Sequence, residues 1–186
     1  MFAYKRYLAY PINIKKKDLK MAKYIITQYG GPYGELGAAL RYFNQRYTMP
    51  DGKGKALLTD IATEELGHVE MISTLIYQLT KDATLEELEE AGLGRNYAQH
   101  GRGIFPSDTF GNAFNTSNMG ITGDPIADIS EDMAAEEKAR VTYEHLINLT
   151  NDKDVKDVLE FLRQREIVHY SRFKELYEEY KKILNK

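Results

Sequence analysis

Two short motifs of the form Glu-x-x-His constrain this chain more than any other feature of its sequence. One reads ELGH, with Glu65 and His68, and the other reads EIVH, with Glu166 and His169. Residues three positions apart lie on one face of a helix, so each motif offers an oxygen and a nitrogen ligand to a common point. The chain has 4 histidines and no cysteine, which leaves histidines and carboxylates as its only strong metal ligands.

A single glutamate precedes each motif at the same distance. Glu35 lies thirty residues before Glu65, and Glu136 lies thirty residues before Glu166. This repeat of a glutamate followed by Glu-x-x-His indicates a duplicated helix pair around a pseudo-twofold axis. It is the pattern of four-helix bundles that hold two metal ions between carboxylates and histidines.

The hydrophobic pattern predicts helices that carry both motifs. Apolar residues recur every three or four positions, the period of a helix with one buried face, and the motif residues fall on these stripes. A first helix places Glu35, Ala39, Tyr42 and Arg46 on one line. The other three helices are predicted over residues 55–79, 125–149 and 155–184.

One long connection, at about 81–123, separates the second predicted helix from the third. It contains a short helix predicted at Leu85–Ala91 and then a glycine-rich stretch. Short links within each helix pair and one long link between the pairs predict an all-α, ferritin-like four-helix bundle with one long crossover connection. With an N-terminal arm at 1–20, we expect residues 1–186 to form a single ferritin-like di-metal domain.

The stretch GGPYGELGAAL at 30–40 is rich in glycine but is not a phosphate-binding loop. No Lys followed by Ser or Thr comes after it, as a loop of that kind requires. Pro32 suits the first turn of a helix, where its missing N–H is not needed. We therefore expect a helix start or kink that carries Glu35 inward, between glycines small enough to let another helix come close.

Composition narrows the possible partners of the chain. Its 186 residues, with a hydrophobic content of 42%, suit one globular domain with a real core. The net charge of -3 and the lack of a basic stripe argue against a nucleic acid as the natural ligand. No apolar run approaches the roughly 20 residues that span a bilayer, and residues 1–20 lack the apolar centre of a signal peptide. We therefore expect the chain to remain inside the cell that makes it.

Burial gives the repeated motifs an energetic reason to bind cations. Carboxylates on apolar helix stripes are strongly destabilising unless they are neutralised, and two divalent ions would neutralise them. Glu64 is four residues before His68 and could replace Glu65, but only Glu65 keeps the thirty-residue spacing. His100 lies in the polar crossover, either as a solvated loop residue or at the mouth of the site.

At this point the sequence resembles a known family. Four segments carry the resemblance, in order and with matching spacing: GGPYGELGAALRYFNQRY, LLTDIATEELGHVEMI, GDPIADISEDMAAEEKAR and FLRQREIVH. They resemble the manganese catalases, and more narrowly the short members associated with the coat of bacterial endospores. The larger members carry a long C-terminal extension that wraps around neighbouring subunits. This sequence ends at Lys186, directly after its fourth predicted helix, so we do not expect that clamp here.

The resemblance implies a ligand set and a reaction. Two manganese ions would be bound by Glu35, Glu65, His68, Glu136 and His169, with Glu65 bridging them. Glu166 would be an outer group near the open coordination positions, whereas the symmetric di-iron template would make it a ligand. The implied reaction is the disproportionation of hydrogen peroxide to water and dioxygen. The implied assembly is a homohexamer, in the cytoplasm or in the spore coat, where other coat proteins would be its neighbours.

Three residues are candidates for roles beside metal binding. Glu166 is the candidate general base and acid, because a carboxylate beside the ions can carry protons. Tyr42, seven residues after Glu35, could hydrogen-bond across the cluster or be an ordinary core tyrosine. Arg140, four residues after Glu136, could offset local negative charge or form a surface ion pair.

Two other functions stay open from the sequence. A ferritin-like di-iron oxidase or iron-handling protein would use nearly the same ligands, because affinity order does not separate manganese from iron in a site of oxygen and nitrogen donors. A structural spore-coat protein with residual catalase activity would keep the fold and its ligands.

Overall fold

The structure, a computed structural model, describes residues 7–98, 101 and 103–184. The secondary structure of this part of the chain is helical. Its only strand-like feature is one isolated β-bridge between Ser107 and Ala113. The α-helices are α1 (Leu19–Ile25), α2 (Thr27–Gly30), α3 (Glu35–Gln45), α4 (Gly52–Thr80), α5 (Leu85–Glu90), α6 (Pro125–Leu149) and α7 (Lys153–Ile183). None of these helices is long and apolar enough to cross a membrane.

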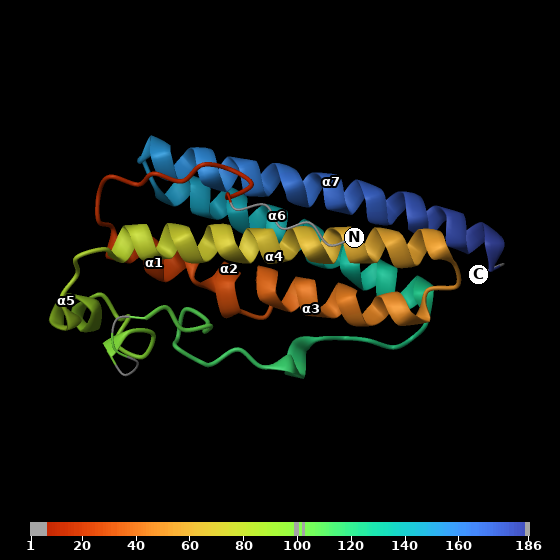
Figure 1. The fold of residues 1–186 in the computed structure, drawn as a ribbon, viewed down its shortest axis with the longest axis horizontal. Helices are drawn as coiled ribbons and strands as arrows, with labels where there is room; N and C mark the ends of the chain where they lie inside the picture. Colours follow the sequence, from red (N-terminus) through yellow and green to blue (C-terminus); the bar gives the residue numbers. More distant parts are fainter. Residues whose placement is uncertain (1–6, 99–100, 102, 185–186) are drawn as a thin grey trace.

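The helices are arranged as a bundle of four rods that lie side by side (Figure 1). The first is broken into α1, α2 and α3, which follow one another along one line, and the other three are α4, α6 and α7. Short links join α3 to α4 and α6 to α7, while the long crossover, green in Figure 1, runs outside the bundle beneath α3. The predicted all-α, ferritin-like bundle with one long crossover is therefore confirmed.

Aspartates fix the starts of the three long helices. The side chains of Asp51, Asp124 and Asp152 accept hydrogen bonds from backbone N–H groups in the first turns of α4, α6 and α7. Such caps satisfy amides that have no partner within the helix. In α6 the cap is followed by Pro125 at the first helical position, where proline fits without losing a hydrogen bond. These caps explain why α4 and α7 begin two or three residues before the hydrophobic pattern does.

The glycine-rich stretch at 30–34 differs from the expectation in two ways. Pro32 lies in the turn before α3 and not in its first turn, because Gly34 is the N-cap and the helix begins at Glu35. The element that approaches Gly30 is the crossover and not a helix. A Cβ at Gly30 would lie 2.5 Å from the backbone nitrogen of Ser107. The glycine therefore lets the crossover lie directly on the junction of α2 and α3.

The core of the bundle consists of two apolar clusters with a polar layer between them. Along α4, Leu58 and Ile61 belong to one cluster, and Met71 and Ile72 belong to the other. The residues between them include Glu65 and His68, which are buried too. A polar layer in the middle of a bundle is unfavourable unless its charges are paired or neutralised. The fold thus places the polar side chains whose burial is most unfavourable at the middle of its long helices.

We predict opposite effects on stability from two glycine substitutions. Gly30→Ala should lower the free energy of unfolding by about 1–3 kcal/mol, because the new methyl group meets the crossover backbone, which cannot rotate away. Gly67→Ala should raise it by about 1 kcal/mol, because nothing lies within 4 Å of a Cβ there and alanine is the better helix former. Urea unfolding monitored by circular dichroism measures both. Equal stability of the two variants would contradict the close approach at Gly30.

Candidate metal centre

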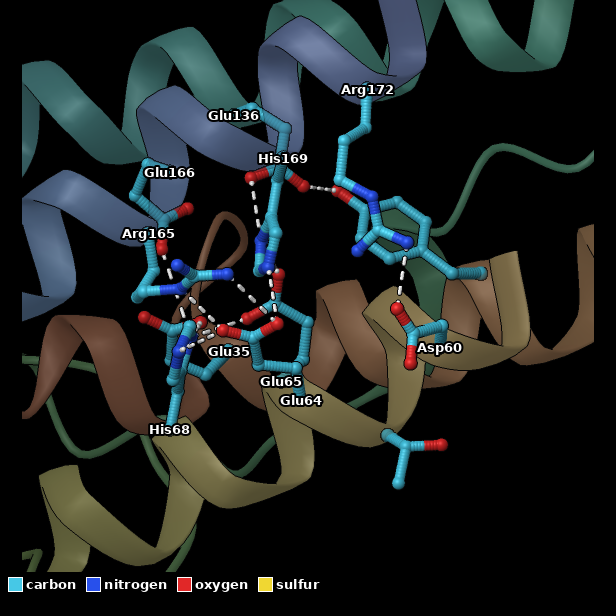
Figure 2. Close-up of polar contacts among 12 residues, drawn as sticks. Glu35, Asp60, Glu64, Glu65, His68, Glu136, Arg165, Glu166, His169 and Arg172 are labelled. Atoms are coloured by element: carbon cyan, nitrogen blue, oxygen red, sulfur yellow. Dashed lines mark hydrogen bonds and ion pairs between the residues drawn. The ribbon is translucent and has the colours of Figure 1, made fainter. Parts of the chain in front are cut away.

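All four rods of the bundle contribute side chains to one buried cluster (Figure 2). Each of its six members is at most 2% exposed. The single glutamates come from α3 and α6, and the two Glu-x-x-His motifs come from α4 and α7. The cluster consists of Glu35, Glu65, His68, Glu136, Glu166 and His169. The helical spacing seen in the sequence thus directs all six side chains toward the bundle axis.

Glu65 lies between the two histidines. Its Oε2 is 2.7 Å from Nδ1 of His68, and its Oε1 is 2.8 Å from Nδ1 of His169. The outer carboxylates follow the same pattern: Oε2 of Glu35 is 3.5 Å from Nδ1 of His68, and Oε2 of Glu136 is 3.5 Å from Nδ1 of His169. The two halves of the cluster therefore repeat one arrangement on either side of Glu65.

The cluster divides into two overlapping groups of potential ligands. In each group, one ligand atom from every residue lies within 4.8 Å of all the others. The groups are Glu35, Glu65, His68 and Glu166, and Glu65, Glu136, Glu166 and His169. Glu65 and Glu166 belong to both. Each group could hold a metal ion, and the shared carboxylates would be within reach of both ions.

The donor atoms of the cluster suit divalent cations. Oε1 of Glu65, Oε2 of Glu136, Oε1 of Glu166 and Nδ1 of His169 are buried without a hydrogen-bond partner among the described residues. The approach of Glu65 to His169 is close but lacks the alignment of a hydrogen bond. Four carboxylates and two neutral imidazoles carry a formal charge that two divalent ions would balance. Oxygen and nitrogen donors without sulfur suit manganese or iron.

Burial and neighbouring charges shift the pKa values of the cluster residues strongly. Burial, together with the charge of Glu65, raises the pKa of Glu35 to about 8. Burial also raises the pKa of Glu166 well above its usual range, and the charges of Glu35 and Glu65 add to this. Burial alone would lower the pKa of both histidines, but the surrounding carboxylates together outweigh it. Glu65 and Glu35 raise the pKa of His68 to about 10, and Glu65, Glu136 and Glu64 raise that of His169 to about 12. Without a cation, protons would have to neutralise the cluster.

Two buried tyrosines each donate a hydrogen bond to the glutamate that precedes the Glu-x-x-His motif of the other half of the repeat. The hydroxyl of Tyr42, on α3, donates to Oε1 of Glu136, on α6. The hydroxyl of Tyr143, on α6, donates to Oε1 of Glu35, on α3. Tyr42 therefore makes the contact across the cluster that its position suggested. Tyr143 was missed, although it lies seven residues after Glu136, as Tyr42 lies seven residues after Glu35.

A second contact, absent from the sequence reasoning, orients the histidines from their outer side. Oε2 of Glu64 is 3.2 Å from Nε2 of His169, and its Oε1 is 3.8 Å from Nε2 of His68. Arg165 holds the same carboxylate, with its Nε 2.5 Å from Oε1 (Figure 2). Burial alone would raise the pKa of Glu64, but His169 and Arg165 lower it to about 2. Glu64 thus stands outside the cluster, while Glu65 occupies its centre.

The structure does not bring Arg140 to the cluster. Its Nη2 is 2.6 Å from Oε1 of Glu137, and its Nη1 is 2.6 Å from Oε1 of Glu144, both near the surface of α6. Of the two roles considered for Arg140, its contacts favour the surface ion pair. His100 lies outside the described residues.

Comparisons with known proteins agree with this geometry. The sequence matches a family described as "Manganese containing catalase" over residues 1–185. It is 54% identical to Protein CotJC of Bacillus subtilis (strain 168), over 96% of this chain and 94% of that protein. It is also 34% identical to a manganese catalase of Bacillus subtilis, over 93% of this chain and 68% of that protein.

A solved structure shares the fold. It is the crystal structure of wild-type KatB, a manganese catalase from Anabaena. The two chains superpose with a TM-score of 0.88 at 36% sequence identity, over 96% of this chain and 80% of that one. At this identity the likeness extends beyond the bundle architecture to the sequence itself.

We predict that the Tyr143 hydroxyl contributes to metal affinity. Tyr143→Phe removes the donor to Glu35, and loss of such an orienting contact typically weakens metal binding by roughly 10–100-fold. Competition with a chelator of known affinity for Mn²⁺ measures the effect.

Tyr180→Phe is the matched control. That tyrosine is equally buried, but its hydroxyl donates to Asp51 at 2.6 Å and not to the cluster. It should lower the stability of the protein and leave its metal affinity unchanged. Equal losses of affinity in both variants would show that Tyr143 acts only through packing.

Proposed function

The chain belongs to the manganese-containing catalase family, and from that premise we propose that it disproportionates hydrogen peroxide to water and dioxygen. We propose two manganese ions as its cofactor, held by Glu35, Glu65, His68, Glu136 and His169. The observation that carries the proposal is the pair of overlapping four-residue groups around the shared Glu65. Two ions close enough to share a carboxylate can take part in one reaction together.

The reaction needs both electrons and protons. Two adjacent manganese ions, when bound, would accept two electrons from one peroxide and return them to the next. Oxidation of peroxide to dioxygen releases two protons, and reduction of peroxide to two waters consumes two. A group beside the ions must therefore hold protons between the half-reactions. An enclosed site favours a residue of the chain itself over bulk water in this role.

Glu166 is the proposed proton carrier. Its carboxylate lies in both ligand groups, with Oε1 3.7 Å from Nδ1 of His68. It also lines a small cavity at the cluster, together with Glu35 and Glu136, whereas Glu65 does not. Burial raises the pKa of Glu166, so its oxygen would accept a proton readily. A carboxylate that faces the cavity can take a proton from a peroxide there and return it.

Outer groups would keep the ligands in place. Tyr42 and Tyr143 donate to Glu136 and Glu35, which restricts the rotation of these carboxylates. Glu64 lies at the Nε2 side of His169, which would leave Nδ1 free to bind a metal. Arg140 has no part in this proposal.

The position of Glu166 also allows an alternative function, that of a di-iron protein. Because it belongs to both ligand groups, the same geometry could hold two iron ions with Glu166 as a ligand, as in a ferritin-like di-iron oxidase. The identity to Protein CotJC supports the further proposal that the chain is one of the short, spore-coat-associated members. A place in the spore coat, with residual catalase activity beside a structural role, is compatible with an intact cluster.

One variant, Glu166→Gln, separates the two assignments. As a proton carrier, Glu166 can be replaced without loss of metal, and oxygen evolution should fall by roughly 10²–10⁴-fold. If Glu166 is instead a ligand, the substitution should lower the metal content, since a neutral amide would replace an anion at a dication. Metal analysis and an oxygen electrode assay on the same preparation measure both quantities.

Two further variants calibrate this experiment. Glu175→Gln is the matched control, because Glu175 is exposed on the same helix and should leave both quantities unchanged. His68→Ala should lose at least one ion per chain. Full activity of Glu166→Gln with full metal content would refute the assigned role, and lost metal would favour the di-iron template.

We also propose that the chain self-associates, as a homohexamer by family resemblance. The crossover exposes Phe110 at 78% and Ile121 at 42%, and neighbouring chains would cover such side chains. Light scattering at micromolar concentration should give six times the 21.4 kDa of one chain. A mass of one chain would refute self-association, and replacing Phe110 by Ser should weaken the assembly without changing the metal content.

A further inference from the structure

Phe110 is the most exposed large hydrophobic side chain among the described residues, at 78%. It lies in a turn of the crossover that the side chain of Asp108 closes. Oδ1 of Asp108 accepts hydrogen bonds from the backbone N–H groups of Phe110, at 2.8 Å, and Asn112, at 2.9 Å. Its Oδ2 accepts another from the side-chain amide of Asn112, at 2.9 Å. The aromatic ring is therefore presented to solvent by a turn that has little freedom to rearrange.

The turn is also anchored to the rest of the crossover. The side-chain amide of Asn96, which is buried, donates to the hydroxyl of Ser107 at 2.5 Å and to the backbone carbonyl of Asp108 at 3.1 Å. Gly111 has a φ of +77°, and a Cβ there would lie 2.3 Å from Cβ of Arg95, so the turn packs directly on that side chain. A side chain whose position is fixed before binding loses little conformational entropy when it binds.

A pocket on another part of the surface is large enough to receive an aromatic ring. It lies where α4 ends and α5 follows (Figure 1), and we call it the α4–α5 pocket. Its volume is about 290 Å³. An apolar cavity of about 150 Å³ is enough to bind benzene, so a phenylalanine ring has room here. Aliphatic groups and two tyrosine rings form much of its lining, which includes Tyr77, Thr80, Ala83, Leu88 and Tyr97.

The charges beside the turn and in the pocket are complementary. Asp108 closes the turn and Arg95 packs against it, so an acid and a base stand beside Phe110. Lys81 and Asp82 line the pocket and are exposed, which places a base and an acid there too. No ion pair joins any of these four residues to another described residue. Such charges would orient two surfaces that meet, more than they would add affinity.

We propose that Phe110 of one chain inserts into the α4–α5 pocket of a second copy of this chain. The inference rests on the proposed self-association and deepens it, because it names both surfaces of one contact. The turn and the pocket are different surfaces of the same chain, so each contact uses one of each. They can pair reciprocally in a twofold dimer or continue from chain to chain around a closed ring. An aromatic anchor in a pocket is the kind of contact whose truncation weakens an interface most.

Two single variants each remove one side of the contact. Phe110→Ser takes away the ring, and Tyr77→Ser removes an aromatic wall of the pocket. Both side chains are mostly exposed, at 78% and 57%, so the chain should fold normally without them. Each variant should raise the protein concentration at which the assembly dissociates, measured by light scattering, by at least about tenfold. Tyr47→Ser is the matched control, because Tyr47 is 72% exposed but belongs to neither surface, and it should leave that concentration unchanged.

A mixing experiment tests whether the two surfaces meet each other. Phe110→Ser keeps an intact pocket, and Tyr77→Ser keeps an intact ring. Each variant alone should have a lower mean mass than the parent at a concentration where the parent is assembled. An equimolar mixture should have a higher mass than either variant alone, because one kind of chain supplies the ring and the other supplies the pocket. A mixture no heavier than its components would overturn the proposal.

The outcomes separate this inference from the proposals on which it rests. An assembled parent whose two variants are unchanged would refute this contact and leave self-association standing. Dissociation of Phe110→Ser but not of Tyr77→Ser would refute the α4–α5 pocket as the binding surface. A parent of one chain would refute self-association together with this contact. Manganese content and oxygen evolution of the parent, measured on the same preparation, test the catalase function independently of its mass.

Discussion

The whole structure depends on the burial of four carboxylates and two imidazoles at one place in the bundle. Each of these groups is at most 2% exposed, and several of their atoms have no hydrogen-bond partner among the described residues. Unpaired charge in a protein interior is strongly unfavourable, and only cations or protons at the centre relieve it. Burial and neighbouring carboxylates raise the pKa values of Glu35, Glu166, His68 and His169, which favours bound protons in that role when no cation is present. Divalent ions bound as proposed would replace these protons, and metal binding would then be coupled to folding.

The surrounding bundle is built to hold this centre. Two apolar clusters lie on either side of the polar layer, so packing on both sides fixes the helices that carry it. The internal repeat makes the arrangement nearly symmetric. Glu136, Tyr143, Glu166 and His169 each lie 101 positions after their counterparts in the first half of the chain (136 minus 35, for example). Each tyrosine donates to the glutamate of the other half, so neither half completes its own site.

The two halves of the repeat differ at two pairs of equivalent positions. Glu64 and Arg165 hold equivalent positions in the two halves, yet one is an acid and the other a base, and they pair with each other beside the histidines. Glu65 lies between the two histidines, whereas its counterpart Glu166 faces the small cavity. In the proposed function, this duplicated frame with two unlike central carboxylates would bind two ions and leave Glu166 facing the cavity.

Much of this architecture follows from the sequence alone. Hydrophobic spacing and helix caps are local signals, so they predicted the three long helices to within a few residues, and helical periodicity alone placed the six cluster residues on inward faces. Helical periodicity did not show which carboxylate lies at the centre, because that depends on how the four rods are rotated against one another; only the family resemblance implied that Glu65 lies there. The sequence did not show that Arg140 turns to Glu137 and Glu144, since several acidic partners were within reach of its long side chain. Nor did it show that the crossover, and not a helix, lies on Gly30. Contacts between segments far apart in sequence are decided by packing, and packing exists only in the folded bundle.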